Sequence, residues 1–193
     1  NLLKVTDEID DFVWIYDAIG EKSVLVPALL KQLETFKYSF SDWLDEYTNR
    51  SNADAFSSFL IKQALSLAKS TADWESIWEA TNNVNEEDFL VVRVALQEVG
   101  WSQKQWEELR DDTGDDDLEN FAMIRLLCFH NTAPEILRFY LHYVGNFEAD
   151  DGVVEKILEK LFSLTTRQEA QIISVLSEED DTLREASDRF LRS

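Results

Sequence analysis

Residues 153–169 read VVEKILEKLFSLTTRQE, and this stretch contains the pattern that decides the fold. Val154, Ile157, Leu158 and Leu161 follow the i, i+3, i+4, i+7 spacing that places apolar side chains on one face of an α-helix. The capping box Thr166-x-x-Glu169 follows within a few residues and is typical of the start of a new helix. A helix that stops and restarts over so short a distance predicts a helical hairpin.

The same signals recur along the rest of the chain. Ser102-x-x-Gln105 and Thr132-x-x-Glu135 are further capping boxes, the second with Pro134 in its first turn. Only two prolines and five glycines interrupt these signals, so helix is expected throughout. Further helix starts are predicted at Pro27, Ser41, Asn52, Thr71, Asn85 and Ser177, and helix ends at Gly20, Gly100 and Gly145.

These signals predict an all-α protein of about 11–12 short helices in antiparallel hairpins, because short connections make successive helices neighbours. A hairpin roughly every 32–40 residues has the length of an α-solenoid repeat. The pattern resembles HEAT-type hairpins in an irregular α-solenoid, and a compact orthogonal helical bundle is the alternative. We expect residues 1–193 to form a single all-helical domain. Because the chain begins with Asn1 and not Met, we expect it to be a piece of a longer protein.

The composition combines strong acidity with enough apolar residues to fold. Thirty-nine acidic residues face 18 basic ones, for a net charge of −21, and 45% of the residues are hydrophobic. The charge is spread along the chain without an acidic tail or a basic arm. A surface without clustered Lys and Arg predicts no direct binding to nucleic acid or to anionic membranes. It favours a protein partner with a basic surface.

The single cysteine bears on location and on chemistry. With only Cys128, no disulfide can form within the chain, which favours a reducing compartment, cytoplasmic or nuclear. The chain has no apolar run near the ~18 residues that a membrane span needs. Cys128 lies in an apolar run and is expected to be a buried packing residue. His130 is two residues away on the same predicted helix, so the two side chains should diverge.

No motif predicts a metal site, a cofactor or catalysis. Asp111-Asp112-Thr113-Gly114-Asp115 resembles the Asp-Asp-x-x-Asp motif of all-helical prenyl-transferring enzymes, which implies magnesium-bound diphosphate. The likeness covers five residues, Gly114 interrupts the helix that the motif needs, and no second acidic motif follows. The same run also fails the EF-hand pattern for calcium. We therefore expect a protein that is not an enzyme and that holds no cofactor and no metal.

The densest acidic run, from Glu107 to Glu119, is the predicted contact region. One interpretation is a solvated turn in which Asp115 caps the next helix. The other is a surface for the Lys and Arg residues of a partner, with a nearby Trp as the anchor. Carboxylate pairs such as Glu155 and Glu159 are too common here to be informative. The predicted partner-binding residues are Trp101, Trp106, Asp111, Asp112, Asp115, Asp116 and Asp117.

Three classes of function remain open on the sequence. The first is a non-enzymatic interaction module, a scaffold or adaptor that binds a basic protein. The second is an acidic inhibitor that neutralises a basic toxin or nuclease, or imitates the phosphate backbone; a mimic would need two spaced rows of carboxylates. The third is a magnesium-dependent helical enzyme, for which magnesium should stabilise the fold through Asp111 and Asp115.

Overall fold

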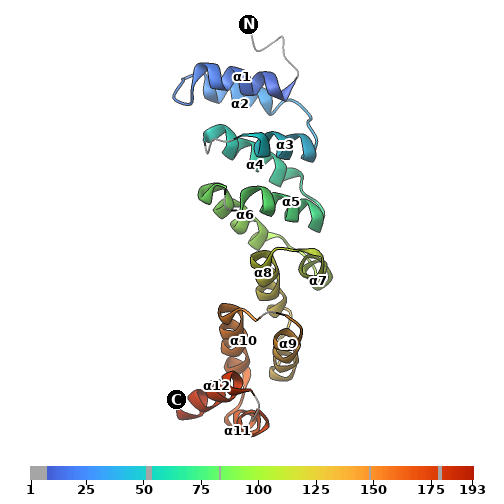
Figure 1. Cartoon of the computed structure of the whole chain (residues 1–193), viewed down its shortest axis with the longest axis vertical. Coiled ribbons are helices and arrows are strands. Elements are labelled where there is room, and N and C mark those ends of the chain that lie inside the picture. The colour runs from blue at the N-terminus through green and yellow to red at the C-terminus, as the bar shows by residue number, and fades with distance from the viewer. Residues whose placement is uncertain (1–7, 51–53, 83, 148, 178–179) are drawn as a thin grey trace. The chain divides into compact units, whose positions relative to one another are not determined.

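The protein is entirely α-helical in the part that the structure describes. The computed structural model describes residues 8–50, 54–82, 84–147, 149–177 and 180–193, and these contain helices and no strand (Figure 1). The all-α prediction is thus confirmed, and the helix number lies within the predicted range. The twelve helices of these residues are α1 (Ile9–Ile19), α2 (Val26–Leu33), α3 (Phe40–Asn49), α4 (Ala55–Leu67), α5 (Thr71–Thr81), α6 (Glu86–Glu98), α7 (Gln103–Asp112), α8 (Asp116–Leu127), α9 (Ala133–Asn146), α10 (Asp151–Leu164), α11 (Arg167–Leu176) and α12 (Asp181–Arg192).

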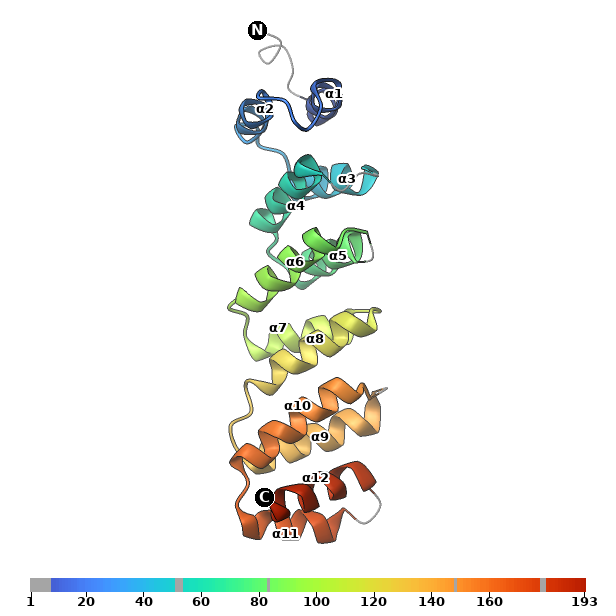
Figure 2. The ribbon, with the colours of Figure 1, turned by 90° about the vertical axis from the view of Figure 1, so that its left-hand side faces the viewer.

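Successive helices pack in pairs, as the short connections predicted. Each odd-numbered helix contacts the even-numbered helix that follows it, and Figure 2 shows the members of α7/α8, α9/α10 and α11/α12 side by side. The contacts group into two compact units, residues 1–100 and residues 101–193. Each unit holds three such pairs. The prediction of a single domain over residues 1–193 stays a prediction.

In the first unit, a buried arginine joins α1 to the start of α4. The Arg50 side chain is only 5% exposed, and its Nη2 lies 3.1 Å from Asp17 Oδ1 and 2.8 Å from Asp54 Oδ2. Its guanidinium carbon also lies 5.4 Å from the ring centroid of Tyr16 and 5.0 Å from that of Phe56. Two carboxylates and two aromatic faces therefore compensate for the loss of water around the charge.

A buried carboxylate joins three helices of the first unit. Asp88 of α6 is 1% exposed, and it accepts hydrogen bonds from Ser58 Oγ on α4 at 2.6 Å and from Tyr47 Oη on α3 at 3.3 Å. Asn85 Nδ2 donates a third at 2.6 Å. Burial, together with the charge of Asp88 and the hydrogen bond to it, raises the pKa of Tyr47. A buried carboxylate needs such donors to avoid a large desolvation cost.

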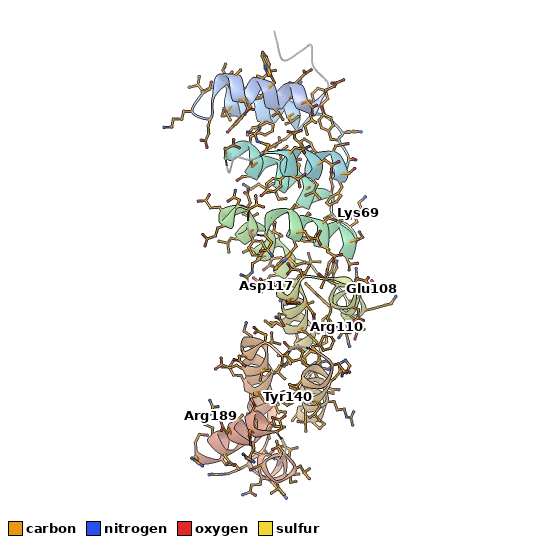
Figure 3. The ribbon with its side chains drawn as sticks, viewed as in Figure 1. Lys69, Glu108, Arg110, Asp117, Tyr140 and Arg189 are labelled. Carbon is orange, nitrogen blue, oxygen red and sulfur yellow. The ribbon has the colours of Figure 1, made fainter. Side chains whose placement is uncertain are left out.

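In the second unit, two tyrosines of α9 reach the other helices. Tyr140 Oη, whose residue is labelled in Figure 3, donates to Asp180 Oδ2 at 2.9 Å, and Asp180 caps α12. Tyr143 Oη donates to Asn120 Oδ1 of α8 at 2.9 Å and accepts from the backbone N–H of Asp150, the cap of α10. One helix is thus hydrogen-bonded to α8 and to the N-terminal caps of α10 and α12.

Most of the predicted helix ends are confirmed. The three capping boxes at Ser102, Thr132 and Thr166 are present, and Asn85 caps α6. Gly20 ends α1 with a φ of 76°, a conformation that glycine adopts without strain. Pro27 lies in the first turn of α2, as predicted.

Two predicted helix starts are wrong by two or three residues. Ser39, not Ser41, caps α3, because Asp42 Oδ2 accepts from the Ser39 backbone N–H at 2.7 Å and completes a reciprocal box. Thr71 is the first residue of α5, as predicted, and Ser70 caps that helix with a reciprocal box of the same kind. Asp180, not Ser177, caps α12.

Two further predicted boundaries need comment. Helix α9 does not end at Gly145 but continues to Asn146, whose Nδ2 donates to the His142 carbonyl at 2.8 Å. The predicted start at Asn52 lies outside the described residues, and Asp54 caps α4. At the start of α3, where Ser39 and Ser41 both offer a hydroxyl, the reciprocal bonds with Asp42 decide that Ser39 is the cap.

Candidate partner-binding surfaces

The predicted contact region lies between α7 and α8, and its carboxylates are partly engaged in local structure. Asp111 Oδ1 lies 2.6 Å from Nη2 of Arg110, a residue labelled in Figure 3 together with Asp117. Asp115 caps α8 by accepting from the Leu118 N–H at 2.8 Å. The structure thus supports the capping role expected for Asp115. We call residues 111–117 the Asp-rich turn.

Two other acidic residues, Asp116 and Asp117, lie in the first turn of α8 and are exposed. Carboxylates there interact favourably with the positive end of the helix dipole. Asp112, at the end of α7, is exposed as well. These three carboxylates remain accessible to a partner, whereas Asp111 and Asp115 already have intramolecular bonds.

The two predicted tryptophan anchors differ in exposure. Trp106 is 1% exposed, because the ring of Trp101 packs edge-on at 4.9 Å, that of Phe121 lies at 6.2 Å, and the Arg125 guanidinium lies 5.6 Å from its centroid. A ring so enclosed belongs to the core and cannot serve as an exposed anchor. Trp101 is partly exposed, so of the pair it alone reaches the surface.

The pKa of one carboxyl group near the Asp-rich turn is shifted. Burial raises the pKa of Glu119, and the nearby charge of Asp116 raises it further, while Arg110 opposes the shift. The local environment therefore disfavours ionisation of Glu119, as expected where carboxylates crowd together.

The residues with potential catalytic or metal-binding chemistry do not assemble into a site. Cys128 was expected to be buried, but it is exposed, because it follows the last residue of α8 and leaves the packed face. The ring of His130 packs against Phe139 at 5.0 Å, and His142 contacts Asn146 of its own helix. Among the described residues, no group of three or more His, Cys, Asp or Glu side chains is placed to hold a metal ion.

A second acidic surface, which the sequence did not single out, lies between α10 and α12. It is a groove of about 610 Å³. Asp151, Glu155 and Glu159 line it from α10 and are exposed. Beside them, Val154, Leu158 and Phe162 form an apolar floor, with exposed fractions of 8%, 7% and 9%. Successive residues within the acidic row and within the apolar row are four positions apart, so the two rows run side by side along α10.

Helix α12 forms the opposite wall of this α10–α12 groove. Thr182, Ala186 and Phe190 line it, again four residues apart, and Arg189 stands next to Phe190. The rings of Phe162 and Phe190 stack with centroids 5.4 Å apart. The C-terminal ends of α10 and α12 therefore meet, and Arg189, labelled in Figure 3, marks that end of the groove.

The charged groups that line the groove are free to bind a partner. Within the described part of the chain, the side chains of Asp151, Glu155, Glu159 and Arg189 form no ion pair and no hydrogen bond. The groove thus combines three unpaired carboxylates, one unpaired guanidinium at its C-terminal end and an apolar floor. This differs from the Asp-rich turn, where Asp111 and Asp115 are already engaged.

A sequence signal for this groove exists but is easily overlooked. The Glu155–Glu159 pair alone is uninformative in so acidic a chain. The informative feature is a pair of neighbouring rows on one helix, each with a spacing of four residues, one acidic and one apolar. This pattern predicts a ridge of carboxylates beside an apolar strip. The matching row on α12 can be recognised only once the two helices are known to be neighbours.

Comparison with known proteins gives no functional assignment. No protein-family model matches the chain, and no match was found among curated proteins or solved structures. The described residues include no helix that is long and apolar enough to cross a membrane.

Proposed function

We propose that this chain is a non-enzymatic helical interaction module, a scaffold or adaptor that binds a protein partner with a basic surface. The observation that carries the proposal is the α10–α12 groove, where unpaired carboxylates border an apolar floor. Apolar burial supplies most of the affinity at protein interfaces, and complementary charge supplies selectivity and a high association rate. The groove offers both on one face of the second unit.

The charge of the whole chain supports the same partner. A net charge of −21 attracts a basic protein over distances limited by the Debye length, about 8–10 Å at physiological salt. The exposed Asp112, Asp116 and Asp117 of the Asp-rich turn add to this field. Their role in the proposal is to accelerate encounter, while the groove holds the partner.

Selection from a random peptide library tests this proposal and does not require the natural partner. Peptides of about 15 residues displayed on phage, selected on the full chain, should be enriched in Lys and Arg together with large apolar residues. Raising salt from about 50 to about 500 mM should lower their association rates far more than it raises their dissociation rates. Selected peptides without basic residues, or association rates indifferent to salt, would overturn the proposal.

A further inference from the structure

We propose that the α10–α12 groove binds an amphipathic basic α-helix of the partner, laid along α10. Cationic residues at every fourth position on one flank of this helix pair with Asp151, Glu155 and Glu159, and its apolar face covers the floor. This inference rests on the proposed function and adds the site, the conformation of the bound segment and its residue spacing.

The spacing of the carboxylates supports a helical occupant. Asp151, Glu155 and Glu159 follow one another at steps of four residues, or roughly 6 Å along the axis. A partner helix has the same rise, so its own four-residue row stays in register along the whole groove. Rows of this kind are the ridges that pack into the grooves of a neighbouring helix.

Backbone hydrogen bonding favours a helix over an extended segment. The two walls of the groove are helices, whose backbone groups are already bonded within α10 and α12. An extended peptide on the apolar floor would bury N–H and C=O groups that find no hydrogen-bond partner there, which makes that complex less stable. A helix satisfies its own backbone groups and presents only side chains to the floor.

Arg189 is the only cationic residue among the described residues that line the groove, and it gives the bound helix a direction. Arg189 lies at the C-terminal end, where Phe162 and Phe190 stack, and its side chain has no ion-pair partner among the described residues. A carboxylate of the bound helix fits at this end, while Lys or Arg residues fit beside Asp151 and Glu155. The end of the bound helix that carries the acidic residue therefore lies beside Arg189.

Two designed peptides of about 15 residues and identical composition provide the probes. The first places Lys at every fourth position beside a matching row of Leu, with one Glu at an end. The second contains the same residues in scrambled order. By isothermal titration calorimetry with the full chain, the patterned peptide should bind at least about tenfold more tightly than the scrambled one.

Charge reversal in the chain locates the site. Glu155→Lys with Glu159→Lys should weaken the patterned peptide about tenfold or more, and a peptide with Glu in place of Lys should recover binding to that variant. Asp112→Lys with Asp116→Lys is the matched control, because it changes the net charge equally at exposed positions outside the groove. The control should weaken binding by no more than about threefold, through the long-range field alone.

A second variant leaves the charge unchanged. Ala186→Phe fills the groove from the α12 wall and should abolish binding of the patterned peptide, with the melting temperature measured to establish that the variant folds. Equal weakening by the two charge reversals, or unaltered binding to a folded Ala186→Phe variant, would refute the groove as the site. Equal affinity of the patterned and scrambled peptides would refute the helical spacing of the bound segment but leave the proposed function intact. If neither peptide binds and the library yields no basic peptide, both the groove proposal and the proposed function are refuted.

Discussion

The second unit carries two acidic surfaces that differ in what their carboxylates do. In the Asp-rich turn, Asp111 pairs with Arg110, and Asp115 caps α8. In the α10–α12 groove, the three carboxylates have no intramolecular partner among the described residues and border an apolar floor. The comparison teaches that a high local density of acidic residues does not by itself make a docking surface, because some of those carboxylates, here Asp111 and Asp115, already form bonds within the fold.

The largest expected effect is on the free energy of unfolding, and it comes from substituting the tryptophans beside the Asp-rich turn. Trp106→Ala should lower the free energy of unfolding by about 3–5 kcal/mol, because it empties a core position that is 1% exposed. Trp101→Ala should cost clearly less, since that ring is partly exposed. Urea denaturation measures both values. A small loss for Trp106→Ala would make this residue a surface anchor after all.

The second effect compares the loss of stability when a helix-capping carboxylate is removed with the loss when an unpaired groove carboxylate is neutralised. Asp115→Ala should lower the free energy of unfolding by about 1 kcal/mol, because the Leu118 N–H loses its acceptor. Asp115→Asn is the matched control and should restore most of the loss, since asparagine caps helices about as well. Glu155→Gln in the groove should stay within about 0.5 kcal/mol of the parent chain. If Glu155→Gln lowered the free energy of unfolding as much as Asp115→Ala, the groove carboxylate would contribute to the fold like the capping one, against the expectation.

A smaller effect is expected on the pH dependence of stability. Burial and Asp116 raise the folded-state pKa of Glu119 above its ordinary value of 4.5, so its ionised form destabilises the fold at neutral pH. Stability should therefore rise as the pH falls from neutral through the raised pKa of Glu119. Hydrogen bonds from the side chain and backbone of Ser39 lower the pKa of Asp42, and the stability it contributes above pH 3.8 is lost on further acidification.

Thermal melts between about pH 3 and pH 8 measure this profile, and a stability maximum on the acid side of neutrality is expected. Glu119→Gln should reduce the gain between neutral pH and that maximum, while Glu107→Gln on α7 serves as the control. A profile that Glu119→Gln leaves unchanged would assign the gain to other carboxyl groups, such as Glu46, whose pKa burial also raises, and not to Glu119.

The smallest effect is expected from divalent cations. Calcium, magnesium or zinc at about 100 µM should leave the melting temperature nearly unchanged, because a ligand specific for the folded state would raise it. The described residues contain no suitable group of ligands at either surface. A rise of several degrees that Asp111→Asn abolishes would instead make the Asp-rich turn a metal site and revive the magnesium-dependent interpretation.

The helical fold could be predicted because its signals are local. Capping boxes and apolar stripes act within one or two turns, so Thr166-x-x-Glu169 and the stripe around Ile157 identify their helices directly. The exact cap was less predictable where several polar residues compete, as at Ser39 and Ser41. The burial of Trp106 depends on Phe121 and Arg125 of another helix, which no local pattern specifies.

Only one wall of the α10–α12 groove could be predicted from the sequence. The acidic row that begins at Asp151 and the apolar row that begins at Val154 can both be seen in the sequence of α10. The wall that faces these rows comes from α12, about 30 residues further along the chain. That pairing is set by packing in three dimensions. The sequence therefore directed attention to the highest density of acidic residues, whereas the structure directs it to the acidic residues that border the apolar floor of a groove.

The hydrogen bonds of α9 have a consequence for how the second unit opens. Helices that make few contacts with the rest of their unit tend to open first. Tyr143 and Tyr140 connect α9 to the caps of α10 and α12, so separation of α12 from α9 breaks the partly buried hydroxyl–carboxylate bond between Tyr140 and Asp180. By hydrogen exchange, the backbone amides of α12 should therefore exchange with solvent at rates close to those of α10. In the Tyr140→Phe variant, the amides of α12 should exchange faster than those of α10, because α12 then unfolds independently.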